Sequence, residues 1–201
     1  MALIDHRKSG PETARVLVAL VENKPGVLTR VASLFRRRNF NIESLTVGHT
    51  DSEEISRMTI VVDASRTNAE MVEHNLMKIV NVIGVQDVTH APAVMRDLAL
   101  IKVKTDHRTR FEIMQLVEVY RAKVVDVCPE SVIVEVTGPE SKLNSMVDML
   151  RPYGIIEMVR TGLVAMVRGS GYWTGVPETD ENGTDEQEEE VAEPAAWTLG
   201  M

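Results

Sequence analysis

The feature of this sequence that most limits its possible folds is an order of short apolar segments that occurs twice. Segments with strand periodicity and segments with helix periodicity alternate as strand, helix, strand, strand, helix, strand. The first copy is expected at 15–21, 27–35, 42–47, 58–62, 72–83 and 85–90. The second is expected at 98–103, 113–120, 124–127, 132–136, 139–150 and 155–159, with a further strand at 163–167. Two modules of one kind are therefore predicted within 201 residues.

The two copies can be laid on each other at an offset of 70 residues, with Gly84 on Gly154. Gly84 is expected to end the helix at 72–83, which the capping-box spacing of Thr67 and Glu70 begins. Ala91-Pro92-Ala93 is expected to be a linker. The predicted fold is α+β: two ferredoxin-like βαββαβ modules, at 15–91 and 95–169.

The first strand is apolar on both of its faces, over Val16 to Val21. Two helices cover only one face of a four-stranded sheet, so the other face or the sheet edge needs another module or subunit. This pattern indicates oligomerisation or a large partner interface.

The formal charge of −8 is concentrated at one end of the chain. Segment 171–201 holds nine of the 30 acidic residues and no Lys or Arg, so residues 1–170 are nearly neutral. The segment is expected to be a disordered acidic tail, and its apolar end, 195–201, is either free or a short docking motif. A neutral body argues against a nucleic-acid-binding surface.

Other classes of protein are excluded by what the sequence lacks. Cys128 is the only cysteine, so no internal disulfide can form, and a lone thiol fits a reducing cytoplasm. No apolar stretch approaches the length of a membrane span, and the first 14 residues lack a signal-peptide hydrophobic region. The five histidines have no ligand-like spacing, and no nucleophile elbow, P-loop or dinucleotide fingerprint is present. We therefore predict no catalytic and no metal-binding residues.

Two polar features stand out from this background. The first is the loop 22–26, ENKPG, which enters a helix whose first N–H groups can bind the carboxylate of a small molecule. An ordinary tight turn explains the same spacing. The second is Arg36-Arg37-Arg38, which either complements the helix dipole or contacts an acidic partner. Asn41 follows at the mouth of the next strand, where its amide could reach a ligand or a neighbouring subunit.

Residues 15–57 read RVLVALVENKPGVLTRVASLFRRRNFNIESLTVGHTDSEEISR. With the motifs E-N-x-x-G-V-L-x-R-V, L-F-x-R-R-x-x-N-I-E-S-L-T-V and S-R-M-T-I, the chain closely resembles the regulatory small subunits of acetolactate synthase (acetohydroxyacid synthase). The resemblance extends over about 14–170: it is loose at 77–88, and it includes 99–103, 125–127, 160–162 and 168–169 in the second half. The acidic tail has no counterpart in it.

The resemblance implies an N-terminal ACT domain that dimerises and a C-terminal domain peculiar to the family. It implies a branched-chain amino acid as effector, most often valine, bound at the ACT dimer interface by Asn23, Gly26, Val27, Asn41 and Ile42. It also implies a separate catalytic large subunit that holds thiamine diphosphate, Mg²⁺ and FAD, and that this chain activates and makes sensitive to feedback. In that arrangement the effector carboxylate lies near Gly26 and Val27, and the partner chain's Asn41 and Ile42 close the site.

Two other functions remain open from the sequence. One is a free-standing ACT-type amino-acid sensor that controls a different enzyme or a transcription factor. The other is a small enzyme of ferredoxin-like fold.

Overall fold

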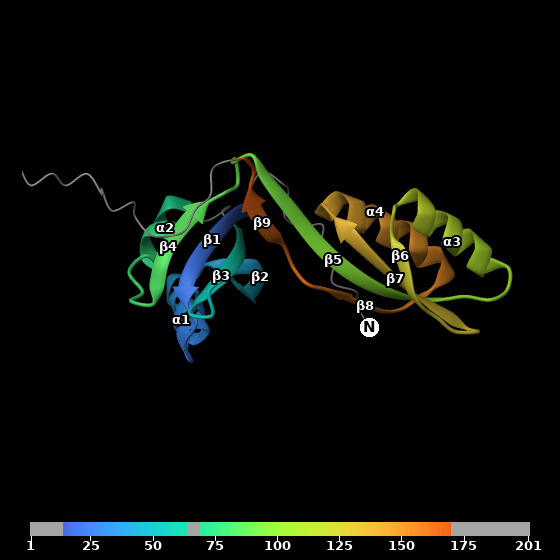
Figure 1. Ribbon diagram of the computed structural model, residues 1–201, viewed down its shortest axis with the longest axis horizontal. Helices are drawn as coiled ribbons and strands as arrows, with labels where there is room; N and C mark the ends of the chain where they lie inside the picture. The colour runs from blue at the N-terminus through green and yellow to red at the C-terminus, as the bar shows by residue number, and fades with distance from the viewer. Residues whose placement is uncertain (1–13, 64–68, 170–201) are drawn as a thin grey trace, which may run out of the picture.

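The computed structural model describes residues 14–63 and 69–169, which form two modules side by side (Figure 1). The elements of the N-terminal module are β1 (Ala14–Glu22), α1 (Val27–Arg38), β2 (Asn41–His49), β3 (Ile55–Asp63), α2 (Ala69–Leu76) and β4 (Val82–Asp87). Those of the second module are β5 (Ala93–Lys104), α3 (Thr109–Val119), β6 (Lys123–Val127), β7 (Ser131–Gly138), α4 (Glu140–Leu150), the 3₁₀ turn η2 (Arg151–Tyr153), β8 (Ile155–Arg160) and β9 (Val164–Val167).

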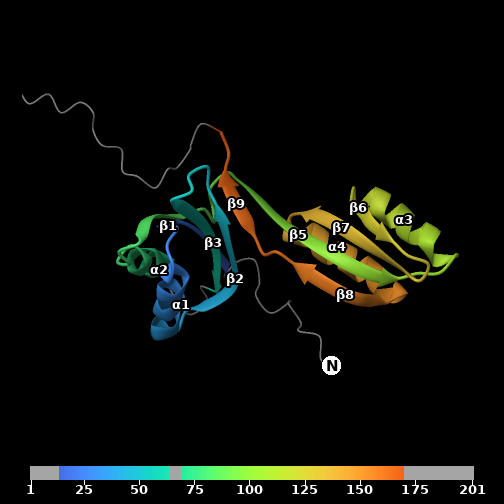
Figure 2. The same cartoon turned by 60° about the horizontal axis from the view of Figure 1, so that its bottom comes forward.

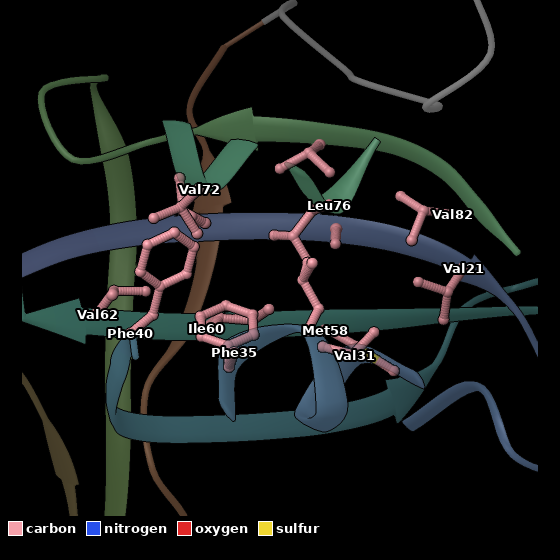
Figure 3. Packing of buried hydrophobic residues seen from close by; sticks show 14 of the residues in the cluster. Val21, Val31, Phe35, Phe40, Met58, Ile60, Val62, Val72, Leu76 and Val82 are labelled. Carbon is pink, nitrogen blue, oxygen red and sulfur yellow. The ribbon is translucent and has the colours of Figure 1, made fainter. Parts of the chain in front are cut away.

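The N-terminal sheet is antiparallel, with strand order β2-β3-β1-β4, so β2 and β4 are its edges. Alternate residues of β1 and β3, such as Leu17 and Ile60, face α1 and α2 and are fully buried. Phe35 and Phe40 meet edge to face between the helices and the sheet, with ring centroids 5.8 Å apart (Figure 3). Val27 at the start of α1 and Phe40, the residue before β2, are both buried in this core, so it positions the starts of these two elements.

The second module repeats the arrangement with strand order β6-β7-β5-β8 and α3 and α4 packed on one face. Ile101 and Val134 of the sheet and Leu143 of α4 are fully buried in its core. The predicted α+β class and the pair of antiparallel modules are confirmed. Among the described residues, no helix is long and apolar enough to span a membrane.

The outer face of the N-terminal sheet is covered by the second half of the same chain. β5 is twelve residues long: its first part, Ala93 to Arg96, pairs with β9, and the rest pairs with β7 and β8. The β5–β9 pair lies on β1 and β3, as Figure 2 shows, and buries Val16, Val18 and Val61 together with Ala165. The second covering layer expected for the first strand is thus a module of this chain, and the outer face of β1 needs no second subunit.

The predicted helix at 72–83 is wrong in its second half. α2 ends at Leu76, two turns follow, and Val82 to Asp87 form β4, so Gly84 lies inside a strand and does not end a helix. The β-branched residues of this stretch pair with β1, and Val82 and Val85 are buried in the core by that pairing. Pairing and burial therefore outweigh the helical spacing on which the prediction rested. Thr67 lies outside the described residues.

The internal repeat has the predicted order but a different register. In the first module Val82 of β4 pairs with Val21, and in the second Ile155 of β8 pairs with Val103, each next to a bulge. The equivalent residues of β4 and β8 are therefore 73 residues apart and not 70. Ala93, expected in a linker, is already the first residue of β5. The predicted acidic tail at 171–201 lies outside the described residues.

Candidate functional site

The loop that joins β1 to α1 holds the start of α1 open to a ligand. Gly26 is the N-cap residue and has φ 85°, a left-handed conformation that glycine adopts without steric cost. No side chain caps α1, and a Cβ placed on Gly26 would have no atom within 4 Å. The N–H of Val27 makes a long hydrogen bond of 3.4 Å to the carbonyl of Lys24, and no side chain accepts from the N–H groups of the first turn, which carry the positive end of the helix dipole. Such an end is suited to a carboxylate.

Asn23 lies beside this helix end and is held by the β2–β3 hairpin. Its backbone N–H donates to the carbonyl of Glu54 at 2.7 Å, and its side-chain Nδ2 donates to the carbonyl of Glu53 at 2.9 Å. Nδ2 keeps a second N–H, so Asn23 presents both that donor and its amide oxygen to a ligand. An oxygen acceptor suits an ammonium group better than a carboxylate.

A polar network supports the loop from the side of β4. Asn81 Nδ2 donates to Glu22, and Arg30 donates to Asn81 Oδ1 at 2.9 Å. The hydrogen bond from Asn81, followed by the nearby Lys24, lowers the pKa of Glu22 below its usual value. Glu22 therefore remains ionised and occupied by its neighbours. Asn81 was not among the predicted site residues, because it falls within the helix predicted at 72–83.

The second module shows what a closed version of the same loop looks like. Asp106 Oδ1 accepts hydrogen bonds from the backbone N–H groups of Arg108 and Thr109, both at 2.8 Å, and from the Thr109 hydroxyl. These bonds lower the pKa of Asp106. A carboxylate of the chain itself thus occupies the start of α3, whereas the start of α1 has none. The two modules share a topology but not an open helix end.

Asn41 and Ile42 lie at the opposite end of the N-terminal sheet. Asn41 pairs with Asp63, which pairs with Ala14 at the start of β1, whereas Asn23 follows the end of β1. Eight residues of antiparallel strand separate the two ends by about 27 Å. Asn41 is exposed, and Ile42 is half-buried against the core. Within one chain the structure brings Asn23, Gly26 and Val27 together and leaves Asn41 and Ile42 apart from them.

Arg36, Arg37 and Arg38 form the last turn of α1 and are exposed, where their charge complements the helix dipole. Among the described residues, no group of three or more His, Cys, Asp or Glu side chains is arranged to hold a metal ion.

Two segments of the chain, between them containing most of the described residues, match known families. Residues 17–84 match the family described as "AHAS small subunit-like ACT domain". Residues 96–169 match the family described as "Small subunit of acetolactate synthase". The chain belongs to the acetolactate synthase small-subunit family.

Individual relatives agree with this membership. A probable acetolactate synthase small subunit from Archaeoglobus fulgidus is 51% identical over 77% of this chain and 96% of its own length. The acetolactate synthase small subunit of Bacillus subtilis is 44% identical over 78% of this chain and 91% of its own length. The crystal structure of the small subunit from Thermotoga maritima superposes with a TM-score of 0.72 at 40% identity, covering 78% of this chain and 98% of that one. The family resemblance expected from the motifs within 15–60 is thereby confirmed.

Proposed function

We propose that this small subunit regulates a separate catalytic large subunit of acetolactate synthase in the cytoplasm, and has no catalytic activity of its own. It raises the activity of that subunit and makes it sensitive to feedback inhibition by a branched-chain amino acid, most often valine. Thiamine diphosphate, Mg²⁺ and FAD belong to the large subunit in this proposal. No residue of this chain is assigned to them.

The observation that carries the proposal is the open, uncapped start of α1 in a chain of this family. The carboxylate of valine would accept hydrogen bonds from the N–H groups near Gly26 and Val27. The amide oxygen of Asn23 would accept a hydrogen bond from the ammonium group of valine. Glycine at the N-cap leaves the ligand room to approach the backbone.

The distance between the two groups of predicted residues supports a site shared by two copies. β2 is an edge strand that runs from Asn41 to His49, and its far end lies at the same end of the sheet as the β1–α1 loop, with β3 between them. If two copies pair their β2 strands antiparallel, Asn41 of each copy meets the His49 end of the other. The pairing would bring Asn41 and Ile42 of one chain toward Asn23 and Gly26 of the next.

A ligand bound between two chains stabilises the dimer over the separate subunits, because it contacts both. Feedback then needs only a coupling of about 1–3 kcal/mol between this site and the catalytic subunit.

Two substitutions of one glycine test the site. Asp and Asn both tolerate the left-handed conformation of Gly26 and have the same shape, so they differ mainly in charge. We expect Gly26→Asp to abolish valine binding in titration calorimetry, since its carboxylate repels that of valine, while Gly26→Asn weakens binding less. Equal affinities for the wild type and Gly26→Asp would reject the site.

A reconstitution experiment tests the regulatory role. The isolated chain is expected to make no acetolactate from pyruvate, and its addition is expected to raise the rate of its cognate large subunit. Turnover by the chain alone would contradict the proposal. Capture from extract of a partner other than a thiamine enzyme would instead favour a free-standing amino-acid sensor.

A further inference from the structure

The segment between β8 and β9, residues 161–163, lies against the outer face of β2. We call it the crossing segment. Thr46 Oγ1 donates to the carbonyl of Thr161 at 3.4 Å, and the N–H of Leu163 donates to Ser44 Oγ at 3.3 Å. These bonds join the edge strand of the N-terminal module to the second half of the chain, more than a hundred residues away.

Gly162 shows how closely the two backbones approach. It has φ 90°, and a Cβ at this position would lie 2.6 Å from Ser44 Oγ and 2.9 Å from Thr46 Oγ1. Both the backbone conformation and the space therefore require glycine. The contact is built into the crossing segment and is not a chance approach of two surface loops.

A bulge in β2 turns Ser44 and Thr46 toward this contact. Ile42 pairs with Val62 and Ser44 pairs with Val61, so Glu43 is an extra residue in the strand. Ile42 and Leu45, three residues apart, consequently both pack against the inner core, which a regular strand would not allow. The bulge at Glu43 thus lies directly between Ile42, which packs against the core, and Ser44, which contacts the crossing segment.

On its other side the crossing segment is bonded into the second module. Thr161 Oγ1 donates to Asp97 Oδ1 at 3.1 Å, and Arg160 donates to Asp97 Oδ2 through two nitrogens at 2.6 and 2.9 Å. Arg160 also donates to Asn144 of α4 at 2.9 Å. Continuous hydrogen bonds thus lead from β2 to the helical layer of the second module.

We propose that Ser44 and Thr46 are positioning residues that connect the effector strand β2 to the second module through the crossing segment. The role rests on the proposed function, in which Asn41 and Ile42 at the start of β2 contact the effector. An effector bound at that end of β2 changes the backbone position at the bulge. Ser44 and Thr46 transmit this displacement through their hydrogen bonds to the crossing segment, and Thr161 transmits it to Asp97 and Arg160. They act on the transmission of the effector signal and not on effector binding.

The test compares Ser44→Ala/Thr46→Val with the wild type, using Thr137→Val as a control, since Thr137 is an exposed strand threonine of the second module. Each full-length chain is titrated with valine in a calorimeter and then reconstituted with the large subunit. The double variant should keep its valine affinity within about twofold, while the valine concentration for half-inhibition rises about 2- to 30-fold. The control should match the wild type in both measurements. Gly162→Ala, which forces the two backbones apart, should raise that concentration as well.

A variant that keeps its valine affinity but needs more valine for half-inhibition has lost transmission, whereas a merely structural defect would change both quantities. If the double variant is inhibited as strongly as the wild type, the positioning role is wrong. If its affinity falls in step with its inhibition, Ser44 and Thr46 serve binding and the role is also wrong. A wild-type chain that neither binds valine nor transmits inhibition would refute the proposed function itself, and this role with it.

Discussion

Breaking the ion pair between Asp97 and Arg160 is expected to destabilise the protein near the place where the two modules meet. The side chain of Asp97 is 7% exposed and that of Arg160 is 20% exposed, with 2.6 Å between the charged atoms. Asp97 also accepts a hydrogen bond from Thr161. Replacing Asp97 leaves a largely buried guanidinium with one protein acceptor, Asn144, in place of a carboxylate.

The expected loss follows from that burial. Removing one partner of a buried pair costs about 3–5 kcal/mol, and the residual exposure of Arg160 lets water recover part of it. We therefore expect Asp97→Ala to lower the free energy of unfolding by about 3 kcal/mol. Asp97→Asn, which keeps an acceptor of similar shape, should lose about 2 kcal/mol.

Urea unfolding followed by circular dichroism measures both values. The matched control is Arg151→Ala, which removes the pair of Arg151 with Asp148, where the side chains are 54% and 67% exposed and 3.5 Å apart. This surface pair should contribute less than about 1 kcal/mol. If Asp97→Ala loses no more than the control does, the pair is solvated in practice and the reasoning from burial fails.

Two further predictions concern the start of α3 and the end of the chain. Hydrogen bonds to the ionised carboxyl lower the pKa of Asp106 in the folded protein, so they stabilise the folded state fully at pH values above the usual pKa of 3.8. This contribution is lost as the pH falls through the lowered pKa. Asp106→Asn should therefore be less stable than the wild type at pH 7 in thermal unfolding, with the difference shrinking below pH 4; a constant difference would contradict the assigned cause. Truncation after Ser170 should leave valine inhibition of the reconstituted enzyme unchanged, and its loss would show that the acidic segment is part of the switch.

Much of the fold could be predicted because burial and periodicity agree in most elements. β1 and β3 alternate between two apolar faces, and α1 begins at Val27 as its spacing indicates. The prediction failed where they disagree: 72–83 has helical spacing, but β1 requires a partner at its edge, and Val82 to Asp87 supply it. Periodicity within a segment carries no information about which distant strand needs a neighbour.

The candidate site could be predicted only in part for a related reason. Asn23 and Gly26 are close in sequence and form one loop, so turn chemistry and helix-end chemistry identify them together. Asn41 was associated with them only through the family resemblance, and in a single chain it lies at the other end of the sheet. Ser44 and Thr46 carried no signal at all, since their contact depends on a bulge and on a glycine far along the chain.

The long strand β5 and its partner β9 also bear on how the protein is made. All the strands and helices of the N-terminal module have been synthesised once Asp87 is added, but the outer face of its sheet still exposes Val16, Val18 and Val61. The residues that cover this face include Ala165, which is among the last of the described chain to be synthesised. A nascent chain therefore holds an apolar sheet face open until almost the whole protein has been translated, and during that interval it is exposed to aggregation and available to chaperones.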